Sequence, residues 1–212
     1  MAVTLEVVNL LNLPPSDLVL SERENAFYQT LKLPKRRTEW LGGRLALKKL
    51  LVSHFGGKQT DFSILAAGGV GKPSIWQGTK PVTIPFSLTH SNGYAIAAVD
   101  PTALCIGIDL ERIAPRIQAW KNDFFHPSEL LAQDDAFLTA LWTQKEALVK
   151  LLGSGLTINS YEVRCIGGNP QFLGKALQIY QNLGAPQITL TTSSNLLPGF
   201  QFSIAVGNLT NF

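Results

Sequence analysis

Cysteine, methionine and charged residues are scarce in this 212-residue chain. It has two cysteines, one methionine and 16% charged residues, against 45% hydrophobic residues. Two cysteines, Cys105 and Cys165, exclude a disulfide framework, and no cysteine–histidine spacing resembles a zinc site. We therefore expect both to be core thiols of a reducing compartment. The hydrophobic fraction is sufficient for a sizeable core and argues against a disordered chain.

Long hydrophobic runs and a large excess of one charge are also missing. No stretch approaches the roughly 18 consecutive apolar residues that a membrane helix needs. The first basic residue, Arg23, comes too late for a secretory signal. The net charge of +3 is too small to indicate nucleic acid or a membrane surface as a partner. We therefore expect a soluble, cytoplasmic protein that binds neither.

The local patterns change repeatedly between helical and strand signals. We expect helices over residues 37–54 and 134–152, and strands over residues 5–13, 82–89, 94–99, 104–110, 161–166, 176–180, 187–191 and 200–206. Another helix should begin after Ser21, because Glu22 and Glu24 in its first turn suit the positive end of the helix dipole. Ser128 is expected to cap a further helical turn.

Two short segments repeat in the same order along the chain. Ala46–Leu51 resembles Ala147–Leu152, and Tyr94–Val99 resembles Gln201–Val206. These repeats favour an α+β fold made of two similar halves related by a pseudo-twofold axis, with a boundary near residues 100–105. A cleft between two such halves is a natural ligand site.

Two carboxylates lie at the end of an apolar stretch that reads Gly-Ile-Asp-Leu-Glu from Gly107. Alternation along a strand places Gly107, Asp109 and Glu111 on one face and Ile106, Ile108 and Leu110 on the other. Carboxylates on one face repel each other, and a hard divalent cation such as Mg²⁺ would relieve that repulsion. The alternative is that the strand emerges into water, where Glu111 pairs with a neighbouring arginine.

The helix expected over residues 134–152 contributes a third carboxylate. Helical spacing predicts a core stripe of Phe137, Leu141, Leu148 and Leu152. Glu146 and Lys150 lie one turn apart on the opposite side, near Trp142. An exposed ion pair is the alternative interpretation, but the large aromatic residue beside it favours a sheltered cleft.

Two stretches, Gly-Ile-Asp-Leu-Glu at 107–111 and Trp-Thr-Gln-Lys-Glu-Ala-Leu-Val-Lys at 142–150, together resemble the signature of the 4′-phosphopantetheinyl transferases. That signature is G-x-D followed by W/F-S/T/C-x-K-E-A/S-x-x-K. The length and two-half organisation are similar to the monomeric kind that activates surfactin synthetase. The resemblance covers about residues 20–156. It implies the fold of that family and a monomer, in which duplication supplies the interface that the short trimeric kind forms between chains.

The resemblance implies a Mg²⁺-dependent enzyme, a holo-[acyl-carrier-protein] synthase. It would transfer the 4′-phosphopantetheine arm of coenzyme A to a serine hydroxyl of an apo acyl or peptidyl carrier protein and release adenosine 3′,5′-bisphosphate. Asp109, Glu111 and Glu146 match the family's magnesium ligands. Lys150 matches a lysine that faces the diphosphate, and Glu146 is the candidate base, either directly or through a metal-bound water.

The resemblance also implies different roles for the two halves. Residues 1–103 would hold the nucleotide end of coenzyme A, and residues 104–212 would carry the metal and catalytic motifs. The residues that match nucleotide contacts are Lys72, Thr89, His90 and, more loosely, Arg37 and Arg44. The segment of about residues 112–125 is expected to help dock the carrier protein.

Two alternatives remain open. One is a non-catalytic protein that binds coenzyme A or a carrier protein, and the complete set of carboxylates with Lys150 argues against it. The other is a different Mg²⁺-dependent phosphate or nucleotide transferase, which the sequence supports poorly because it has no Gly-rich phosphate loop. Taken singly, Lys72 also fits a turn residue, His90 a hairpin tip, and the two arginines a solvated helix face.

Overall fold

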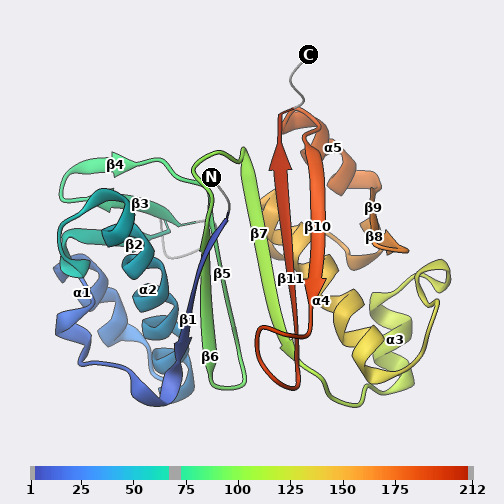
Figure 1. Ribbon diagram of the computed structural model, residues 1–212, viewed down its shortest axis with the longest axis horizontal. Helices are drawn as coiled ribbons and strands as arrows, with labels where there is room; N and C mark the ends of the chain where they lie inside the picture. Colours follow the sequence, from blue (N-terminus) through green and yellow to red (C-terminus); the bar gives the residue numbers. More distant parts are fainter. Residues whose placement is uncertain (1–2, 67–72, 210–212) are drawn as a thin grey trace. The chain divides into compact units, whose positions relative to one another are not determined.

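The computed structural model describes residues 3–66 and 73–209, which form two compact units. Unit 1 is Met1–Pro101 and unit 2 is Thr102–Phe212. Each unit combines helices with small antiparallel sheets, so the α+β fold class expected from the sequence is confirmed (Figure 1).

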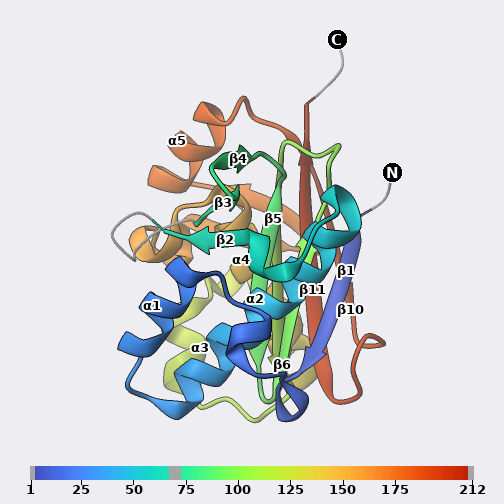
Figure 2. The same ribbon diagram turned by 90° about the vertical axis from the view of Figure 1, so that its left-hand side faces the viewer.

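Unit 1 contains two three-stranded antiparallel sheets. Its elements in chain order are β1 (Thr4–Asn9), η1 (Leu10–Asn12), η2 (Ser16–Leu18), α1 (Glu22–Thr30), α2 (Pro34–Phe55), η3 (Gln59–Asp61), β2 (Phe62–Leu65), β3 (Ser74–Gln77), β4 (Lys80–Val82), β5 (Phe86–Ser91) and β6 (Tyr94–Val99). The larger strands pair in the order β1-β6-β5, and α2 packs on this sheet, as Figure 2 shows. The second sheet has the order β2-β3-β4.

Unit 2 contains a three-stranded sheet and a hairpin, again antiparallel. Its elements in chain order are β7 (Cys105–Arg112), α3 (Gln118–Phe124), η5 (Pro127–Glu129), α4 (Asp135–Leu152), η6 (Gly155–Thr157), η7 (Ser160–Glu162), β8 (Val163–Ile166), β9 (Asn169–Phe172), α5 (Gly174–Asn182), β10 (Gln187–Ser193) and β11 (Phe200–Asn208). The sheet has the order β10-β11-β7, with α4 packed on β7 and β11, and β8 pairs with β9.

The two units share one topology. In each, the last strand lies at the centre of the main sheet, between the first strand and the strand before it in the chain. In each, a long helix packs on the first and last strands and is followed by a hairpin. The sequence repeats fall on these equivalent elements, since one pair lies in α2 and α4 and the other in β6 and β11. The two halves are therefore similar in the order and packing of their elements, and not only in two short sequence segments.

Local sequence explains where several elements begin and end. Ser21 and Glu24 form the reciprocal capping box of α1. Asp134 caps α4 through the Phe137 N–H, and Gly153 ends that helix in the left-handed conformation. The predicted helix over residues 134–152 is thus confirmed to within one residue. Helix α2 begins three residues earlier than predicted, because Pro34 occupies the first turn, where its missing N–H costs nothing.

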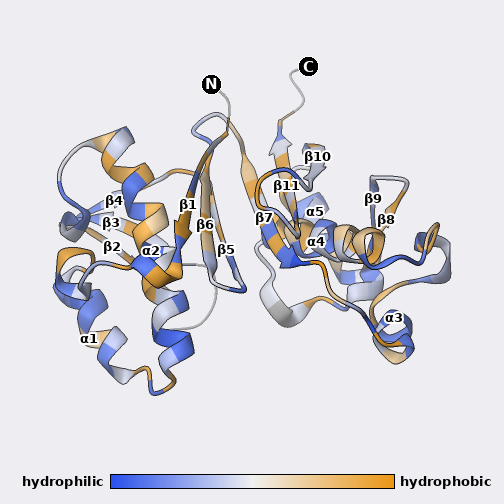
Figure 3. Cartoon of the chain, turned by 60° about the horizontal axis from the view of Figure 1, so that its bottom comes forward, coloured by the Kyte–Doolittle hydropathy of each residue, from blue (hydrophilic) through white to orange (hydrophobic). Residues whose placement is uncertain are grey.

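The hydrophobic residues gather where the pattern predicts, with some additions. Figure 3 shows the apolar strand β6 in orange and the polar helix α1 largely in blue. Leu141, Leu148 and Leu152 are buried in the core of unit 2, whereas Phe137 is only partly buried against it. In the part of the chain that the structure covers, no helix is long and apolar enough to cross a membrane.

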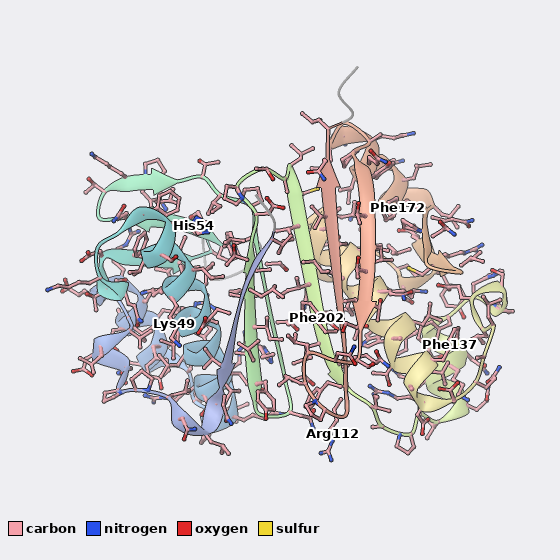
Figure 4. The ribbon with its side chains drawn as sticks, viewed as in Figure 1. Lys49, His54, Arg112, Phe137, Phe172 and Phe202 are labelled. Carbon is pink, nitrogen blue, oxygen red and sulfur yellow. The ribbon has the colours of Figure 1, made fainter. Side chains whose placement is uncertain are left out.

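One predicted strand is wrong, because residues 176–180 lie in helix α5. Ala176, Ile179, Tyr180 and Leu183 pack against the core of unit 2 at helical spacing. Figure 4 shows Phe172 of β9, whose ring lies 4.8 Å from that of Tyr180. A five-residue apolar window is too short to separate a period of two from one of 3.6.

Other boundaries also differ from the prediction. The strand expected over residues 161–166 begins at Val163, after the 3₁₀ turn η7. The first strand ends at Asn9, whose side chain caps a short 3₁₀ turn instead of continuing to residue 13. The stretch over residues 82–89 is split, and Pro85, which has no N–H for a sheet ladder, lies in the gap. The turn at Pro127–Glu129 is capped by His126, whose Nδ1 accepts from the Ser128 N–H, and not by Ser128.

Gly107 permits the closest helix–sheet contact in unit 2, and its replacement should be costly. A Cβ atom at Gly107 would lie 1.9 Å from the Ala147 carbonyl oxygen and 2.4 Å from the Leu151 nitrogen. We expect Gly107→Ala to lower the free energy of unfolding by about 1–3 kcal/mol, because α4 must move off the strand. Denaturant unfolding at neutral pH measures the change.

The matched control is Gly43→Ala in the middle of α2, where a Cβ would meet no described atom within 4 Å. This change should raise the free energy of unfolding by about 0.5–1 kcal/mol, since alanine favours the helix. A Gly107→Ala protein as stable as the wild type would show that α4 is free to shift.

Candidate functional site

The carboxylates predicted on β7 lie on the side of the sheet that faces α4. Gly107 touches α4 directly, and strand alternation places Asp109 and Glu111 on the same face. Ser203, which lies opposite Asp109 on β11, exchanges a 2.7 Å hydrogen bond with Thr143 of α4. The predicted orientation of the strand is therefore correct, and Asp109 is buried, with 5% of its surface exposed.

Lys150 of α4 reaches across to this strand. Its Nζ donates to Asp109 Oδ1 at 2.7 Å, in an ion pair where 30% of the lysine side chain but only 7% of the aspartate side chain is exposed. The sequence alone offered Glu146 as the helical partner of Lys150. The structure instead brings Lys150 to the strand and thus joins the two halves of the predicted signature.

Glu146 lies close enough to the strand carboxylates to be affected by their charge. Its pKa is raised, first by burial and then by the negative charges of Asp109 and Glu111, while Lys150 opposes the rise. Asp109, Glu111 and Lys150 thus all act on the charge of Glu146. Burial, together with the negative charges of Asp109 and Glu111, holds the proton on Glu146 more tightly than in water.

The donor chemistry of this region suits a hard divalent cation. All three side chains offer carboxylate oxygens, which Mg²⁺ prefers, and their mutual repulsion is what such an ion would relieve. Within residues 3–66 and 73–209, no group of three or more His, Cys, Asp or Glu side chains is arranged to hold an ion. The fit is therefore one of donor type and charge, with Asp109 held by Lys150.

Trp142 of α4 belongs to an aromatic cluster that the sequence did not predict. Its ring centroid lies 4.9 Å from that of Phe124 and 5.5 Å from that of Trp120, both with edge-to-face geometry. Phe125 packs against the same two tryptophans. The side chain thus anchors α3 to α4, and does not stand alone beside the Glu146–Lys150 pair.

A second candidate site is a pocket of about 390 Å³ within unit 1. The residues that line it are Phe27, Arg36, Glu39, Trp40, Gly43, Arg44, Leu65, Ala66, Pro73, Leu88, Thr89 and His90. Of the predicted nucleotide contacts, Arg44, Thr89 and His90 are therefore brought together here. Lys72 lies outside the described residues.

Arg44 is the most buried cation of this pocket. Its guanidinium lies 4.0 Å from the centroid of the Trp40 ring, and one terminal nitrogen donates to the Ile64 carbonyl at 3.3 Å. Burial, reinforced by Arg36 and opposed by Glu24, lowers its pKa to about 10. Its Nε is buried and has no hydrogen-bond partner among the residues the structure describes. A ligand that offers an acceptor would satisfy this donor.

The pocket also holds a carboxylate that the sequence did not single out. Glu39 Oε1 lies 3.7 Å from His90 Nδ1 and 3.9 Å from Lys35 Nζ. The His90 side chain is 38% exposed, whereas Thr89 is buried. The wall of the pocket therefore presents an imidazole held beside a carboxylate, next to the cations of Arg36 and Arg44.

Arg37 is not among the residues that line this pocket. Its guanidinium lies 4.4 Å from the centroid of the Tyr28 ring and 3.4 Å from Gln29 Oε1, both on α1. Its neighbour Arg36 lines the pocket instead. Helical spacing alone placed Arg37 and Arg44 on one face, but which part of that face α1 covers depends on tertiary packing.

One model of a known protein family matches most of unit 2. The model of the 4′-phosphopantetheinyl transferase superfamily matches residues 105–186, which include β7 and α4. A solved structure described as a complex of ACPS with CoA from Chronobacterium ammoniagenes is similar with a TM-score of 0.40 and 17% identity, covering 50% of this chain and 97% of that one.

Two curated relatives extend the comparison. The chain is 32% identical over 151 residues to the 4′-phosphopantetheinyl transferase psf-1 of Bacillus pumilus, a match that covers 66% of this chain and 59% of the relative. This length exceeds either unit, so the similarity reaches into both. The chain is also 35% identical over 88 residues to the holo-[acyl-carrier-protein] synthase of Geobacillus sp. (strain WCH70), covering 39% of this chain and 73% of that protein. The chain therefore belongs to the 4′-phosphopantetheinyl transferase superfamily.

Proposed function

We propose that this protein transfers the 4′-phosphopantetheine arm of coenzyme A to a serine hydroxyl of an apo carrier protein and releases adenosine 3′,5′-bisphosphate. The observation that carries the proposal is the grouping of Asp109, Lys150 and Glu146 on β7 and α4. The chain spans about 59% of the length of its Bacillus pumilus relative, whose name states this transferase activity. Membership of the superfamily supports assigning the same reaction to this chain.

Unit 2 would carry the reacting groups. Asp109, Glu111 and Glu146 would hold Mg²⁺, which when bound neutralises diphosphate charge and polarises the reacting phosphoryl group. The Lys150 ammonium would stabilise the charge that develops on the leaving phosphate. Glu146 would accept the proton of the carrier serine at a carboxylate oxygen. Its raised pKa brings the group closer to the working pH, which suits a general base.

Unit 1 would hold the nucleotide end of coenzyme A. The cations of Arg36 and Arg44, with His90 and Thr89, line one pocket and provide donors for a ribose 3′-phosphate. The buried Arg44 Nε provides a donor for the ligand alone. Lys72 is assigned to the same end of the molecule on the family motif.

The carrier protein would dock on the segment of about residues 112–125. This segment contains α3 and the exposed side chain of Ile117, which is 73% exposed. The positive net charge of the chain favours an acidic partner. We propose a cytoplasmic, monomeric enzyme.

Mass spectrometry of an apo carrier protein tests this function directly. The carrier would be incubated with this protein, coenzyme A and Mg²⁺, and a mass gain of one phosphopantetheine group is the expected result. Binding of coenzyme A without a mass gain on acyl and peptidyl carriers would instead support a non-catalytic binding protein. The same assay supplies the rates for the variants below.

The carboxylates of unit 2 should be essential for transfer. We expect Asp109→Ala or Glu146→Ala to reduce the transfer rate at saturating Mg²⁺ and coenzyme A at least 100-fold, a loss of about 3 kcal/mol of transition-state stabilisation. Glu6→Ala is a matched control, because Glu6 of β1 pairs with Lys49 of α2 at the same 2.7 Å (Lys49 is labelled in Figure 4). Retention of more than a tenth of the activity would remove that residue from the metal site.

Neighbouring arginines on α2 should differ in their effect on coenzyme A. We expect Arg36→Ala to raise the KM for coenzyme A about tenfold, the loss of one charge-assisted contact to phosphate. Arg37→Ala should change it less than twofold, since its guanidinium lies over Tyr28. Steady-state kinetics with the carrier in excess measures both. A larger effect at Arg37 would restore the assignment made from the sequence.

Replacing Glu146 should change how stability depends on pH. The raised pKa means that the folded chain binds this proton more tightly than the unfolded chain, so folding loses stability as pH rises above about 4.5. We therefore expect Glu146→Gln to be more stable than the wild type at about pH 8, with the two converging near pH 4. Thermal unfolding in a chelator measures the difference. A difference that does not vary with pH would contradict the raised pKa of Glu146.

A further inference from the structure

Among the residues that the structure describes, each unit has a fully buried lysine–glutamate pair outside the proposed catalytic groups. Lys48 of α2 pairs with Glu24, and Lys145 of α4 pairs with Glu129. No more than 2% of any of these four side chains is exposed. In both units the lysine lies on the long helix, and the glutamate is the third residue of a capped turn that precedes that helix.

In unit 1 the pair connects four segments. Lys48 Nζ donates to Glu24 Oε2 and, at 2.8 Å, to the Val19 carbonyl. Glu24 Oε2 accepts from the Ser21 N–H at 3.0 Å, which closes the cap of α1. Glu24 Oε1 accepts from the Ile64 N–H at 3.0 Å, which fixes strand β2.

In unit 2 the same connections recur. Lys145 Nζ donates to Glu129 Oε2 at 2.9 Å and to the Phe124 carbonyl at 2.8 Å. Glu129 Oε2 accepts from the His126 N–H at 2.8 Å, and Oε1 accepts from the Cys165 N–H at 2.9 Å on β8. Cap, long helix and hairpin strand are therefore joined by equivalent atoms in both units.

These buried charges are expensive to desolvate. Burial lowers the pKa of Lys48 and of Lys145, with the partner glutamate opposing the change in each case. Burial and then the charge of Glu129 raise the pKa of Cys165 to about 12. Apolar side chains of similar volume would often stabilise a fold equally well, so a role in fixing the position of segments accounts better for two such pairs.

The pair in unit 1 contacts residues that adjoin the proposed nucleotide pocket. Glu24 lies in the first turn of α1, the helix that carries Phe27, and it accepts from the Ile64 N–H, after which Leu65 and Ala66 line the pocket. Arg44, one turn from Lys48 on α2, donates to the Ile64 carbonyl. The charge of Glu24 also acts on Arg44.

The pair in unit 2 holds the segment that follows β7. Lys145 binds the last residue of α3 and both oxygens of Glu129, and thereby ties residues 118–129 to α4 beside Glu146. This segment is flanked by the exposed side chains of Ile117 and Leu131, which are 73% and 66% exposed. Residues 118–125 of this segment also belong to the proposed docking segment for the carrier protein, and Lys145 holds the carbonyl of Phe124 within it.

We propose that the two pairs are positioning residues for different substrates. The Glu24–Lys48 pair orders the pocket for coenzyme A, and the Glu129–Lys145 pair orders the segment that receives the carrier protein. This inference rests on the proposed transferase function. The same buried lysine–glutamate arrangement, repeated in the two units, would thus serve two separate binding steps.

Two double variants with matched chemistry test the proposal. Glu24→Gln/Lys48→Met and Glu129→Gln/Lys145→Met each remove both charges, so neither leaves an unpaired buried ion. We expect the first to raise the KM for coenzyme A at least fivefold and the KM for the carrier less than twofold. The second should do the reverse. In both variants kcat should stay within about threefold of the wild type, because no reacting group is touched.

Several outcomes would overturn the proposal. Folded variants that raise the same KM equally, or raise neither, would show that the pairs are only structural. If a double variant does not fold, Glu24→Asp and Glu129→Asp, which keep both charges but shorten the carboxylate, are scored by the same KM criterion. Amide hydrogen exchange in the absence of substrates gives a second measurement, with faster exchange expected over residues 62–66 in the first variant and 118–129 in the second.

The proposed function and this inference fail in different ways. A wild-type protein that transfers no phosphopantetheine contradicts the function, and the substrate roles of the pairs then fall with it. A wild-type protein that transfers normally, with variants that show no split between the two KM values, leaves the function standing and removes the inference alone.

Discussion

The packing of α4 on β7 at Gly107 is the constraint on which unit 2 depends. A side chain at this position would overlap with the Ala147 carbonyl of the helix, so the helix can lie directly on the strand only at glycine. This closeness brings Lys150 within 2.7 Å of Asp109 and places Glu146 in the field of the strand carboxylates. The charged side chains of the candidate site therefore lie close together because α4 packs tightly on β7.

Neighbouring residues of one helix have different roles because burial separates them. Lys145 is buried, and its ammonium contacts Glu129, a backbone carbonyl and the ring of Phe125. Lys150, one turn and a half away, keeps 30% of its side chain exposed and can meet a ligand. Glu146 lies between them with a raised pKa. The same helix thus holds a buried ion pair on one side and the groups proposed to react on another.

The repeated topology supplies one scaffold for two kinds of site. Each unit has the same strand order, a long helix on the sheet and a buried lysine–glutamate pair. Unit 1 uses this scaffold to form a pocket lined by arginines and an imidazole, whereas unit 2 uses it to group carboxylates with a lysine. Helix–strand ion pairs also recur, with Lys49–Glu6 in unit 1 and Lys150–Asp109 in unit 2. Only the side chains around the second pair make it a candidate for catalysis.

The sequence by itself determined what short-range patterns can encode. Alternation placed Asp109 and Glu111 on one face, helical spacing placed Glu146 and Lys150 one turn apart, and the repeats indicated two similar α+β halves. It predicted a strand for residues 176–180, which lie in helix α5, and it singled out Arg37 where Arg36 lines the pocket. It also gave no sign of the Lys145–Glu129 pair, whose partners are 16 residues apart. Those outcomes depend on which surfaces meet in the folded chain, because burial and long-range contact, and not local period, select the partner of a charge and the face of a helix.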